Sequence, residues 1–151
     1  MTEESSQAVL RQPIGFWTGE AHQQVGAKLR RTLADNNLSQ PQWWMLNHLD
    51  SESWSRDALL DRLAPYNTNE EGRDLATELD RLLDRGLVST GCSGDGLAIT
   101  SDGIEVLTVS RRLNGAANHA MLAGVSDDDL VTCINVLRVI VRNLGGDDSL
   151  R

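Results

Sequence analysis

Two arginines offer the clearest chemistry in the sequence. Arg73 and Arg81 lie eight residues apart within a segment that is predicted to be one helix, so both could face the same phosphate backbone. The same spacing allows each guanidinium group to pair locally with neighbouring acids such as Asp74 and Glu78. The residues alone favour neither phosphate contact nor local ion pairing.

Aromatic side chains form a second group. Trp17, Trp43, Trp44 and Tyr66 could line a pocket for an aromatic ligand, although aromatics at these spacings more often pack in a core, so we assign a pocket role to only one or two of them. His48 could sense pH or touch such a ligand, and the alternative is a structural histidine near a helix end. The candidate ligand-contact residues are Trp17, Trp44, His48 and Tyr66.

Metal, redox and catalytic chemistry find little support. The three histidines fall in separate segments, the two cysteines are 41 positions apart, and no pair has the spacing of a metal site. No glycine-rich phosphate loop and no nucleophile motif is present. We expect a protein that is not an enzyme and that uses no metal and no cofactor.

The two cysteines have different predicted roles. Cys92 falls in a predicted hairpin turn, where an exposed thiol could act as an oxidation switch; this is a minor hypothesis because no basic residue lies near it in the sequence. Cys133 falls in an apolar helix and is predicted to pack as a small core side chain.

Composition indicates one globular domain. The chain has 151 residues, of which 40% are hydrophobic and 24% are charged. No apolar run approaches the roughly 20 residues of a membrane helix, and residues 1–12 lack the layout of a signal peptide. We therefore expect a cytoplasmic protein without membrane contact. The net charge of −8 opposes generic DNA binding, so any DNA contact must come from a local basic face.

Apolar periodicity predicts the first helices. A stripe with steps of three or four residues indicates a helix from Pro13 to about Asn37, after a polar first dozen residues that should fray. Ser39, with Gln42 three places on, predicts a capping box at the start of the next helix. A third helix is expected over about 55–64.

The second half of the chain contains a hairpin between helices. Thr68 is the predicted cap of a helix over 68–85 that Gly86 ends. Strand-like runs at 87–90 and 97–100 flank a glycine-rich turn, which is typical of a β-hairpin. A long helix is expected over 101–122, and Ser126 is the predicted cap of the last helix.

The order of these elements predicts the fold class. Three compact helices followed by a small hairpin form a winged helix-turn-helix, which is mainly α with a small β-hairpin wing and here occupies residues 38–103. The flanking helices, within 13–37 and 104–145, are too apolar to stay uncovered, so we expect them to pair with a second copy of the chain. The prediction is a single domain over 1–151 with N- and C-terminal dimerisation helices.

Three segments resemble the MarR family of bacterial transcription regulators. The segment from Leu38 to Leu49 is similar to the family pattern Leu-Thr-x-x-Gln-x-x-Val-Leu-x-x-Leu. Residues 79–88 resemble the end of the family's recognition helix and its first wing strand, and residues 97–103 resemble the returning strand and the next helix cap. The three segments occur in the family's order, and the likeness spans nearly the whole chain.

The resemblance implies a homodimer that binds double-stranded DNA. In the family, the first and the last two helices join the subunits, the recognition helix enters a major groove, and the hairpin lies near the minor groove. Members often release DNA when a small, commonly aromatic molecule binds between the dimer region and the DNA-reading lobe. The candidate DNA-contact residues are Arg56, Thr68, Asn69, Arg73, Thr77 and Arg81. Thr68 and Asn69 could instead cap their helix.

The charge of the DNA-reading lobe departs from the family pattern. Thr77 stands where the family often has Arg, and no Lys or Arg occurs between Arg85 and Arg111, which includes the wing. Residues 55–105 hold five basic and eleven acidic side chains, which leaves a net charge of −6. We expect a transcription regulator that binds DNA and responds to a small molecule. The alternative is a winged-helix protein-interaction module, for example an anti-repressor.

Overall fold

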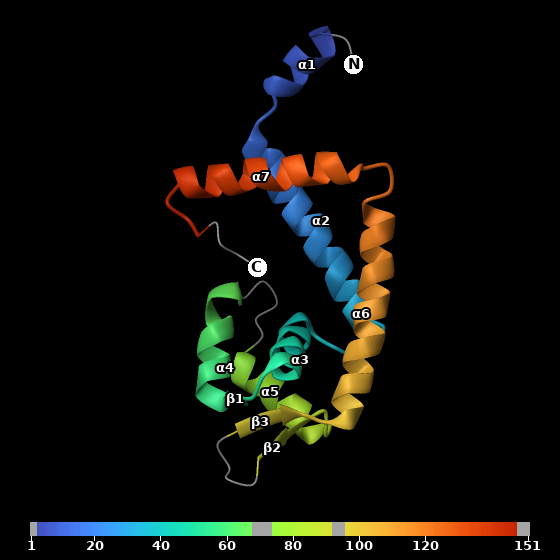
Figure 1. Ribbon diagram of the computed structural model, residues 1–151, viewed down its shortest axis with the longest axis vertical. Coiled ribbons are helices and arrows are strands. Elements are labelled where there is room, and N and C mark those ends of the chain that lie inside the picture. The colour runs from blue at the N-terminus through green and yellow to red at the C-terminus, as the bar shows by residue number, and fades with distance from the viewer. Residues whose placement is uncertain (1–2, 68–73, 92–95, 148–151) are drawn as a thin grey trace. The chain divides into compact units, whose positions relative to one another are not determined.

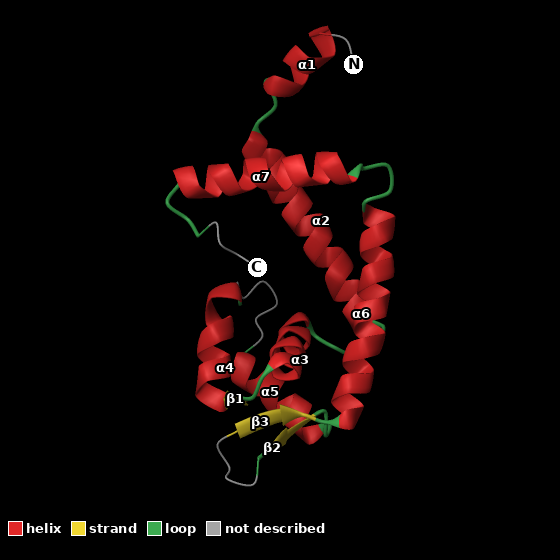
Figure 2. Ribbon diagram, viewed as in Figure 1, coloured by secondary structure: helices red, strands yellow, loops and turns green. Residues whose placement is uncertain are grey.

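A computed structural model of the chain describes residues 3–67, 74–91 and 96–147, which form a mainly helical fold with one small sheet (Figures 1 and 2). The helices are α1 (Glu3–Leu10), α2 (Ile14–Ala34), α3 (Gln40–Ser51), α4 (Arg56–Leu63), α5 (Leu75–Asp84), α6 (Ser101–Met121) and α7 (Asp127–Asn143), with a 3-10 turn η1 over Ala64–Tyr66. The strands are β1 (Trp54–Ser55), β2 (Val88–Thr90) and β3 (Gly96–Ile99). The side chains of residues 3–6 and of Tyr66 lie outside the description.

The chain divides into two compact units. The first is Met1–Ala117 and the second is Asn118–Arg151, so the boundary falls inside α6. The first unit holds the winged helix-turn-helix, and the second holds the end of α6 and all of α7. The assignment of all 151 residues to one domain, with dimerisation roles for the flanking helices, stays a prediction.

The wing is a three-stranded antiparallel sheet in the order β1-β3-β2. Val88 pairs with Ile99 and Thr90 with Leu97, which confirms the predicted hairpin. The sequence did not reveal β1, where Trp54 also pairs with Leu97, because a strand of two residues is too short to show an alternating pattern. The turn residues 92–95, including Cys92, lie outside the described residues.

The N-terminal residues form a helix where we predicted fraying. Helix α1 covers Glu3–Leu10, a segment with neither Gly nor Pro and several good helix formers. Pro13 then adopts an extended conformation and is the N-cap of α2, close to the predicted start of that helix.

Of the three predicted helix caps, two are confirmed and one is wrong. Ser39 and Gln42 form the predicted capping box: Gln42 N–H donates to Ser39 Oγ at 3.3 Å, and Ser39 N–H donates to Gln42 Oε1 at 3.2 Å. Ser126 caps α7 as predicted. The predicted start of the fourth helix at Thr68 is wrong, because α5 begins at Leu75 with Asp74 as its N-cap. Asp is among the strongest N-cap residues and competes well for that place.

A single leucine-rich core holds the winged lobe together. Helix α3 contacts α2, α4, α5 and β3, so it is the element against which the others pack (Figure 2). The buried apolar residues are Leu33, Leu38, Met45, Leu46, Leu49, Leu59, Leu63, Leu75, Leu79, Leu82, Leu87, Val88, Leu97 and Leu107. The packing of α5 on α3 through such residues fixes which face of α5 remains exposed.

The start of α6 approaches the sheet very closely. Gly103 is buried in the first turn of α6, and its N–H donates to Thr100 Oγ1 at 3.1 Å. A Cβ atom at Gly103 would lie 2.2 Å from the Leu87 carbonyl oxygen, so only glycine fits. This contact accounts for the glycine in the segment that resembles the family's helix cap.

Polar contacts tie α6 to the helices before it. Asn36 Nδ2 donates to the Val106 carbonyl oxygen at 3.0 Å and to the buried Ser110 hydroxyl at 2.7 Å. The next residue of the same helix is Arg111. Its guanidinium donates to Asn47 Oδ1 at 2.8 and 3.0 Å and pairs with Asp50 at 2.7 Å. The N-terminal half of α6 is therefore fixed to α3 within the first unit.

Helices α2 and α7 expose large apolar side chains. On α2 these are Ile14, Phe16, Trp17 and Val25. On α7 no residue is buried, and the exposed apolar residues are Val131, Ile134, Val136, Leu137, Val139 and Val141. The predicted burial of Cys133 is wrong, because it shares the exposure of α7. Among the described helices, none is both long and apolar enough to cross a membrane.

Candidate functional site

Helix α5 presents one polar stripe to solvent. Leu75, Leu79 and Leu82 are buried, whereas the residues on the opposite side of the helix are exposed. The exposed stripe follows the helical steps of three and four residues and consists of Thr77, Asp80, Arg81 and Asp84. It carries one cation and two acids, so its own net charge is negative.

The N-terminus of α5 is organised by Asp74 and Thr77. The Asp74 carboxylate accepts hydrogen bonds from Thr77 N–H at 2.9 Å and from Thr77 Oγ1 at 2.8 Å. These bonds, the backbone bond first, lower the pKa of Asp74 below its ordinary value. The Thr77 hydroxyl is therefore used inside the helix start, although the side chain lies on the exposed stripe.

Arg56, the first residue of α4, lies against the same stripe. Its guanidinium pairs with Asp80 at 2.8 Å and donates to the Ala76 carbonyl oxygen at 3.4 Å. The side chains of Arg56 and Asp80 are 40% and 57% exposed, so water screens the pair and it adds little stability. Its main effect is to place a basic side chain from α4 beside α5.

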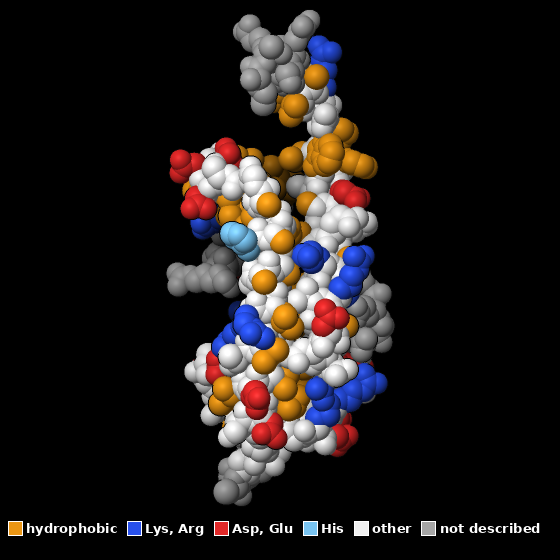
Figure 3. Space-filling model, turned by 90° about the vertical axis from the view of Figure 1, so that its right-hand side faces the viewer, with side chains coloured by type: hydrophobic (Ala, Val, Ile, Leu, Met, Phe, Trp, Pro, Cys, Tyr) orange, Lys and Arg blue, Asp and Glu red, His pale blue; other side chains and the backbone are white. Residues whose placement is uncertain are grey.

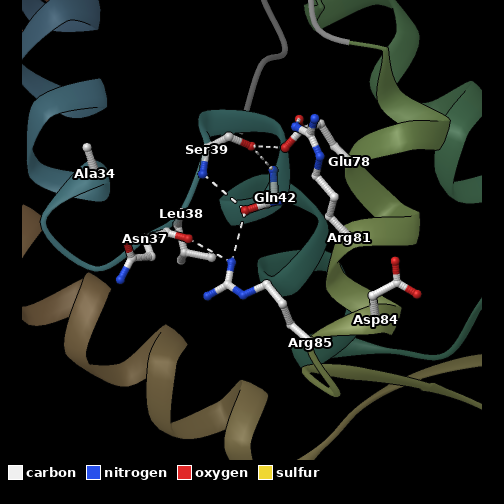
Figure 4. A pocket seen from close by; sticks show the side chains of 9 residues that line it. All are labelled: Ala34, Asn37, Leu38, Ser39, Gln42, Glu78, Arg81, Asp84 and Arg85. Atoms are coloured by element: carbon white, nitrogen blue, oxygen red, sulfur yellow. Dashed lines mark hydrogen bonds and ion pairs between the residues drawn. The ribbon is translucent and has the colours of Figure 1, made fainter.

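A buried carboxylate lies on the inner side of α5. Glu78 is 1% exposed and sits between the leucines of the helix. Ser39 Oγ donates to Glu78 Oε2 at 2.6 Å, and Arg81 Nη1 donates to Glu78 Oε1 (Figure 4). The carboxylate thus connects the cap of α3 to the cation of the exposed stripe.

Arg85 makes a second connection between α5 and the start of α3. Its Nη1 donates to the Asn37 carbonyl oxygen at 2.7 Å and to Gln42 Oε1 at 3.4 Å (Figure 4). Asn37 has a φ of +52°, a left-handed conformation that Asn tolerates better than most residues. This conformation lets the turn between α2 and α3 aim its carbonyl oxygen at α5.

These two connections border an open cavity of about 450 Å³. Its wall is polar on the α5 side, where Glu78, Arg81, Asp84 and Arg85 contribute. The remaining lining residues, from the α2 end and the start of α3, are Ala34, Asn37, Leu38, Ser39 and Gln42. All nine belong to the first unit, and none of them is a predicted ligand-contact residue.

The predicted DNA-contact residues are only partly described. Thr77 and Arg81 lie on the exposed stripe of α5, and Arg56 lies beside that stripe through its ion pair with Asp80. Thr68, Asn69 and Arg73 lie outside the described residues. On the face that Figure 3 shows, basic side chains occur in separate groups with acidic side chains between them.

The predicted ligand-contact residues lie on different elements. Trp17 is exposed on α2, where its Nε1 donates to Gln12 Oε1 at 2.6 Å. Trp44 and His48 lie one turn apart on α3, and Trp44 packs partly buried against the core. Tyr66 ends the η1 turn. A shared ligand pocket for these residues stays a prediction.

His48 has a partly buried environment. Its ring contacts the Trp54 ring edge to face, with 5.5 Å between centroids. Burial of the imidazole, followed by the nearby Arg62 guanidinium, lowers the pKa of His48, and Glu52 opposes the shift. The neutral ring is therefore favoured at neutral pH. The buried Nε1 of Trp54 has no acceptor among the described residues.

Glu78 was not among the residues predicted to form the site. The leucine stripe of α5 was visible in the sequence, and Glu78 occupies a position within that stripe, three residues after Leu75. An acid in an apolar stripe is the signal that would have found it. Among the described residues, no group of three His, Cys, Asp or Glu side chains could hold a metal ion.

Comparison with solved structures defines the class of fold. A MarR family transcriptional regulator from Silicibacter pomeroyi aligns with 95% of this chain and 99% of its own, with a TM-score of 0.68 and 20% identity. The coverage is nearly complete on both sides. The chain therefore has the winged-helix fold of the MarR-family transcription regulators.

Two further structures with this fold were solved in studies of small molecules. CouR from Rhodococcus jostii RHA1 bound to p-coumaroyl-CoA aligns with 87% of this chain and 93% of its own, at 18% identity and a TM-score of 0.64. BpsR from Bordetella bronchiseptica, whose DNA binding is regulated by 6-hydroxynicotinic acid, aligns with 85% of this chain and 94% of its own, at 20% identity and a TM-score of 0.65. No protein-family model and no curated protein matches the sequence.

Proposed function

We propose that the chain is a DNA-binding transcription regulator that contacts DNA with α5. The observation that carries the proposal is the exposed stripe of α5, which a leucine core presents on a winged-helix lobe. An α-helix fits the major groove, and side chains on its exposed face can reach phosphates and base edges. Arg81 supplies donors there, and Arg56 supplies another from α4. The Thr77 hydroxyl donates its proton to Asp74, so its oxygen is offered to DNA as an acceptor.

The proposed regulator works as a cytoplasmic homodimer. Exposed apolar side chains on α2, such as Phe16 and Trp17, and others on α7 support this, because exposed apolar surface of this kind is seldom left in water. A second copy of the chain can cover it by two-fold symmetry, since the same patch on both copies is self-complementary. Two copies would also present two α5 helices to one DNA duplex.

The proposed effector is a small aromatic molecule. The fold is shared with BpsR, which 6-hydroxynicotinic acid regulates, and with CouR, which was solved with p-coumaroyl-CoA. The candidate contacts are Trp17, Trp44, His48 and Tyr66, whose flat rings suit stacking on an aromatic ligand. We expect aromatic acids, or their coenzyme A thioesters, to raise the melting temperature of the protein and to weaken its binding to DNA.

The test is fluorescence anisotropy at low salt with two duplexes of equal length. One carries the sequence upstream of the chain's own gene, and the other carries the same bases in shuffled order. Tighter binding to the first duplex, weakened in Arg81→Ala, supports the proposal. Equal binding to both duplexes, or no binding to either, contradicts it.

A second candidate function is binding to a protein partner in place of DNA. The pairing of Arg56 with Asp80 and of Arg81 with Glu78 favours it, because each cation beside the stripe is offset by an acid. Such a surface attracts phosphate weakly. A basic winged-helix regulator would be the partner, and its capture from native lysate by the wild type but not by Asp80→Lys would support this alternative.

A further inference from the structure

Glu78 is a charged group in a place where charge is costly. It is buried among the leucines of α5, with 1% of its surface exposed. A buried carboxylate destabilises a fold unless hydrogen bonds and an opposite charge compensate it. Leu75, Leu79 and Leu82 would pack equally well around an apolar residue, so packing alone does not account for an acid at this position.

The position of the carboxylate is fixed from outside α5. Ser39 Oγ donates to Glu78 Oε2 at 2.6 Å. Ser39 Oγ also accepts a hydrogen bond from the Gln42 N–H at the start of α3. The Ser39 hydroxyl proton therefore points at Glu78 while its lone pair serves the cap. The capping box holds Ser39 in place. The hydrogen bond from Ser39 therefore also limits the movement of the Glu78 carboxylate.

Arg81 connects this buried group to the surface. Its Nη1 donates to Glu78 Oε1, while its side chain remains 54% exposed on the stripe. A guanidinium has five N–H donors, and the contact with Glu78 occupies one nitrogen. The contact also restricts the rotamers of a side chain that otherwise has large conformational freedom.

We propose that Glu78 is a positioning residue that orients Arg81 for one base contact and limits its attraction to phosphate. The proposal rests on the function proposed above. An oriented guanidinium makes a bidentate contact to a guanine without the cost of ordering a flexible side chain. The negative charge of Glu78 offsets the positive charge of Arg81, so the pair contributes little to sequence-independent binding. Glu78 thereby favours selectivity over affinity.

The matched variants are Glu78→Gln and Asp84→Asn. Each removes one negative charge from α5, but Asp84 lies at the exposed end of the helix and the structure gives it no contact with Arg81. Glu78→Gln keeps the volume and an oxygen that accepts from Ser39. Two measurements apply to each variant: selection of preferred sites from a library of random duplexes, and the salt dependence of binding to one duplex of scrambled sequence.

The proposal makes different predictions for the two variants. Both should bind the scrambled duplex more tightly, by about fivefold at 0.1 M salt, and Glu78→Gln should steepen the slope of log affinity against log salt by about 0.9. Only Glu78→Gln should lose the preference for guanine at one position in each half-site of the selected DNA. Asp84→Asn, which leaves the contact between Arg81 and Glu78 in place, should keep the guanine preference at that position.

A second variant keeps the test decisive if Glu78→Gln does not fold. Arg81→Lys retains the positive charge but lacks the planar fork, so the guanine preference should weaken while the salt slope stays as in the wild type. Full retention of the wild-type site by Glu78→Gln or by Arg81→Lys overturns the proposal. A wild type that selects no site from the library contradicts the proposed function itself, and the inference fails with it.

Discussion

The hydroxyl of Ser39 lies 2.6 Å from the buried carboxylate of Glu78, which joins the N-cap of α3 to the inner face of α5. The orientation of α5 on α3 is therefore set by a polar contact as well as by leucine packing. Arg85 adds a second polar contact to the same turn, through the Asn37 carbonyl oxygen. Two contacts on one side of α5 restrict its rotation, which decides which residues face outward.

Replacing Ser39 with Ala should destabilise the protein more than the same change at Ser126. Both residues cap a helix, and loss of a cap costs about 1 kcal/mol. Ser39→Ala also removes a partner of a buried carboxylate, so its total cost should reach about 2–3 kcal/mol. Urea denaturation of the two variants measures the difference. Equal losses would show that the contact with Glu78 contributes nothing to stability.

The close approach of Gly103 to Leu87 predicts opposite effects for two glycine substitutions in α6. Gly103→Ala would force a Cβ atom against a carbonyl oxygen and should cost about 1–3 kcal/mol. Gly115 has no heavy atom within 4 Å of such a Cβ, and Gly115→Ala should stabilise the helix by about 0.5–1 kcal/mol. Thermal unfolding at matched concentration distinguishes them. A tolerated Gly103→Ala would contradict the packing of α6 on the sheet.

His48 should make the stability of the fold depend on pH. Its pKa in the folded state is lowered from the ordinary value of 6.5, so the unfolded chain takes up the proton first as the pH falls. The fold therefore loses stability below pH 6.5 down to the folded-state pKa, and stability is regained as the pH rises. Comparison with His48→Gln, from pH 7.5 to 5, isolates this contribution. Parallel profiles for the two proteins would refute it.

The exposed apolar residues of α7 predict how the chain self-associates. Introducing a charge at Ile134 or Leu137 should convert the proposed dimer to monomer, because it places an unpaired charge in an apolar interface. Ala58→Glu is the control, because Ala58 is exposed on α4, outside the apolar surfaces of α2 and α7, and it should leave the assembly intact. Analytical ultracentrifugation measures the mass of each. Dimers of equal stability in all three would exclude α7 from the interface.

The sequence predicted the winged helix because its signals are local. Ser39 with Gln42, the leucine steps of α5 and Gly86 each act within a few residues, and the structure has all three. The start of α5 was misplaced, since Thr68 and Asp74 are both good caps and only the fold decides between them. The short strand β1 escaped notice for a similar reason: its two residues become a strand only by pairing with β3.

The candidate site was harder to predict, because it is assembled from distant parts of the chain. Sequence spacing suggested that Arg81 pairs either with phosphate or with a neighbouring acid, and the structure gives the acid as Glu78. That Glu78 is buried and shared with Ser39, 39 residues away, could not follow from helical spacing. Cys133 was assigned to a core from its apolar neighbours, but apolar neighbours do not distinguish a buried face from an uncovered one.

The proposed function requires that α5 faces DNA, and a gain of positive charge on its exposed stripe tests this most directly. Thr77→Arg adds a cation to the stripe, whereas Thr132→Arg adds the same cation to α7. Binding to a scrambled duplex should tighten about fivefold at 0.1 M salt, with a slope steeper by about 0.9, in Thr77→Arg alone. Equal effects of the two substitutions, or a larger effect of Thr132→Arg, would contradict the assignment of α5 as the DNA-contacting helix.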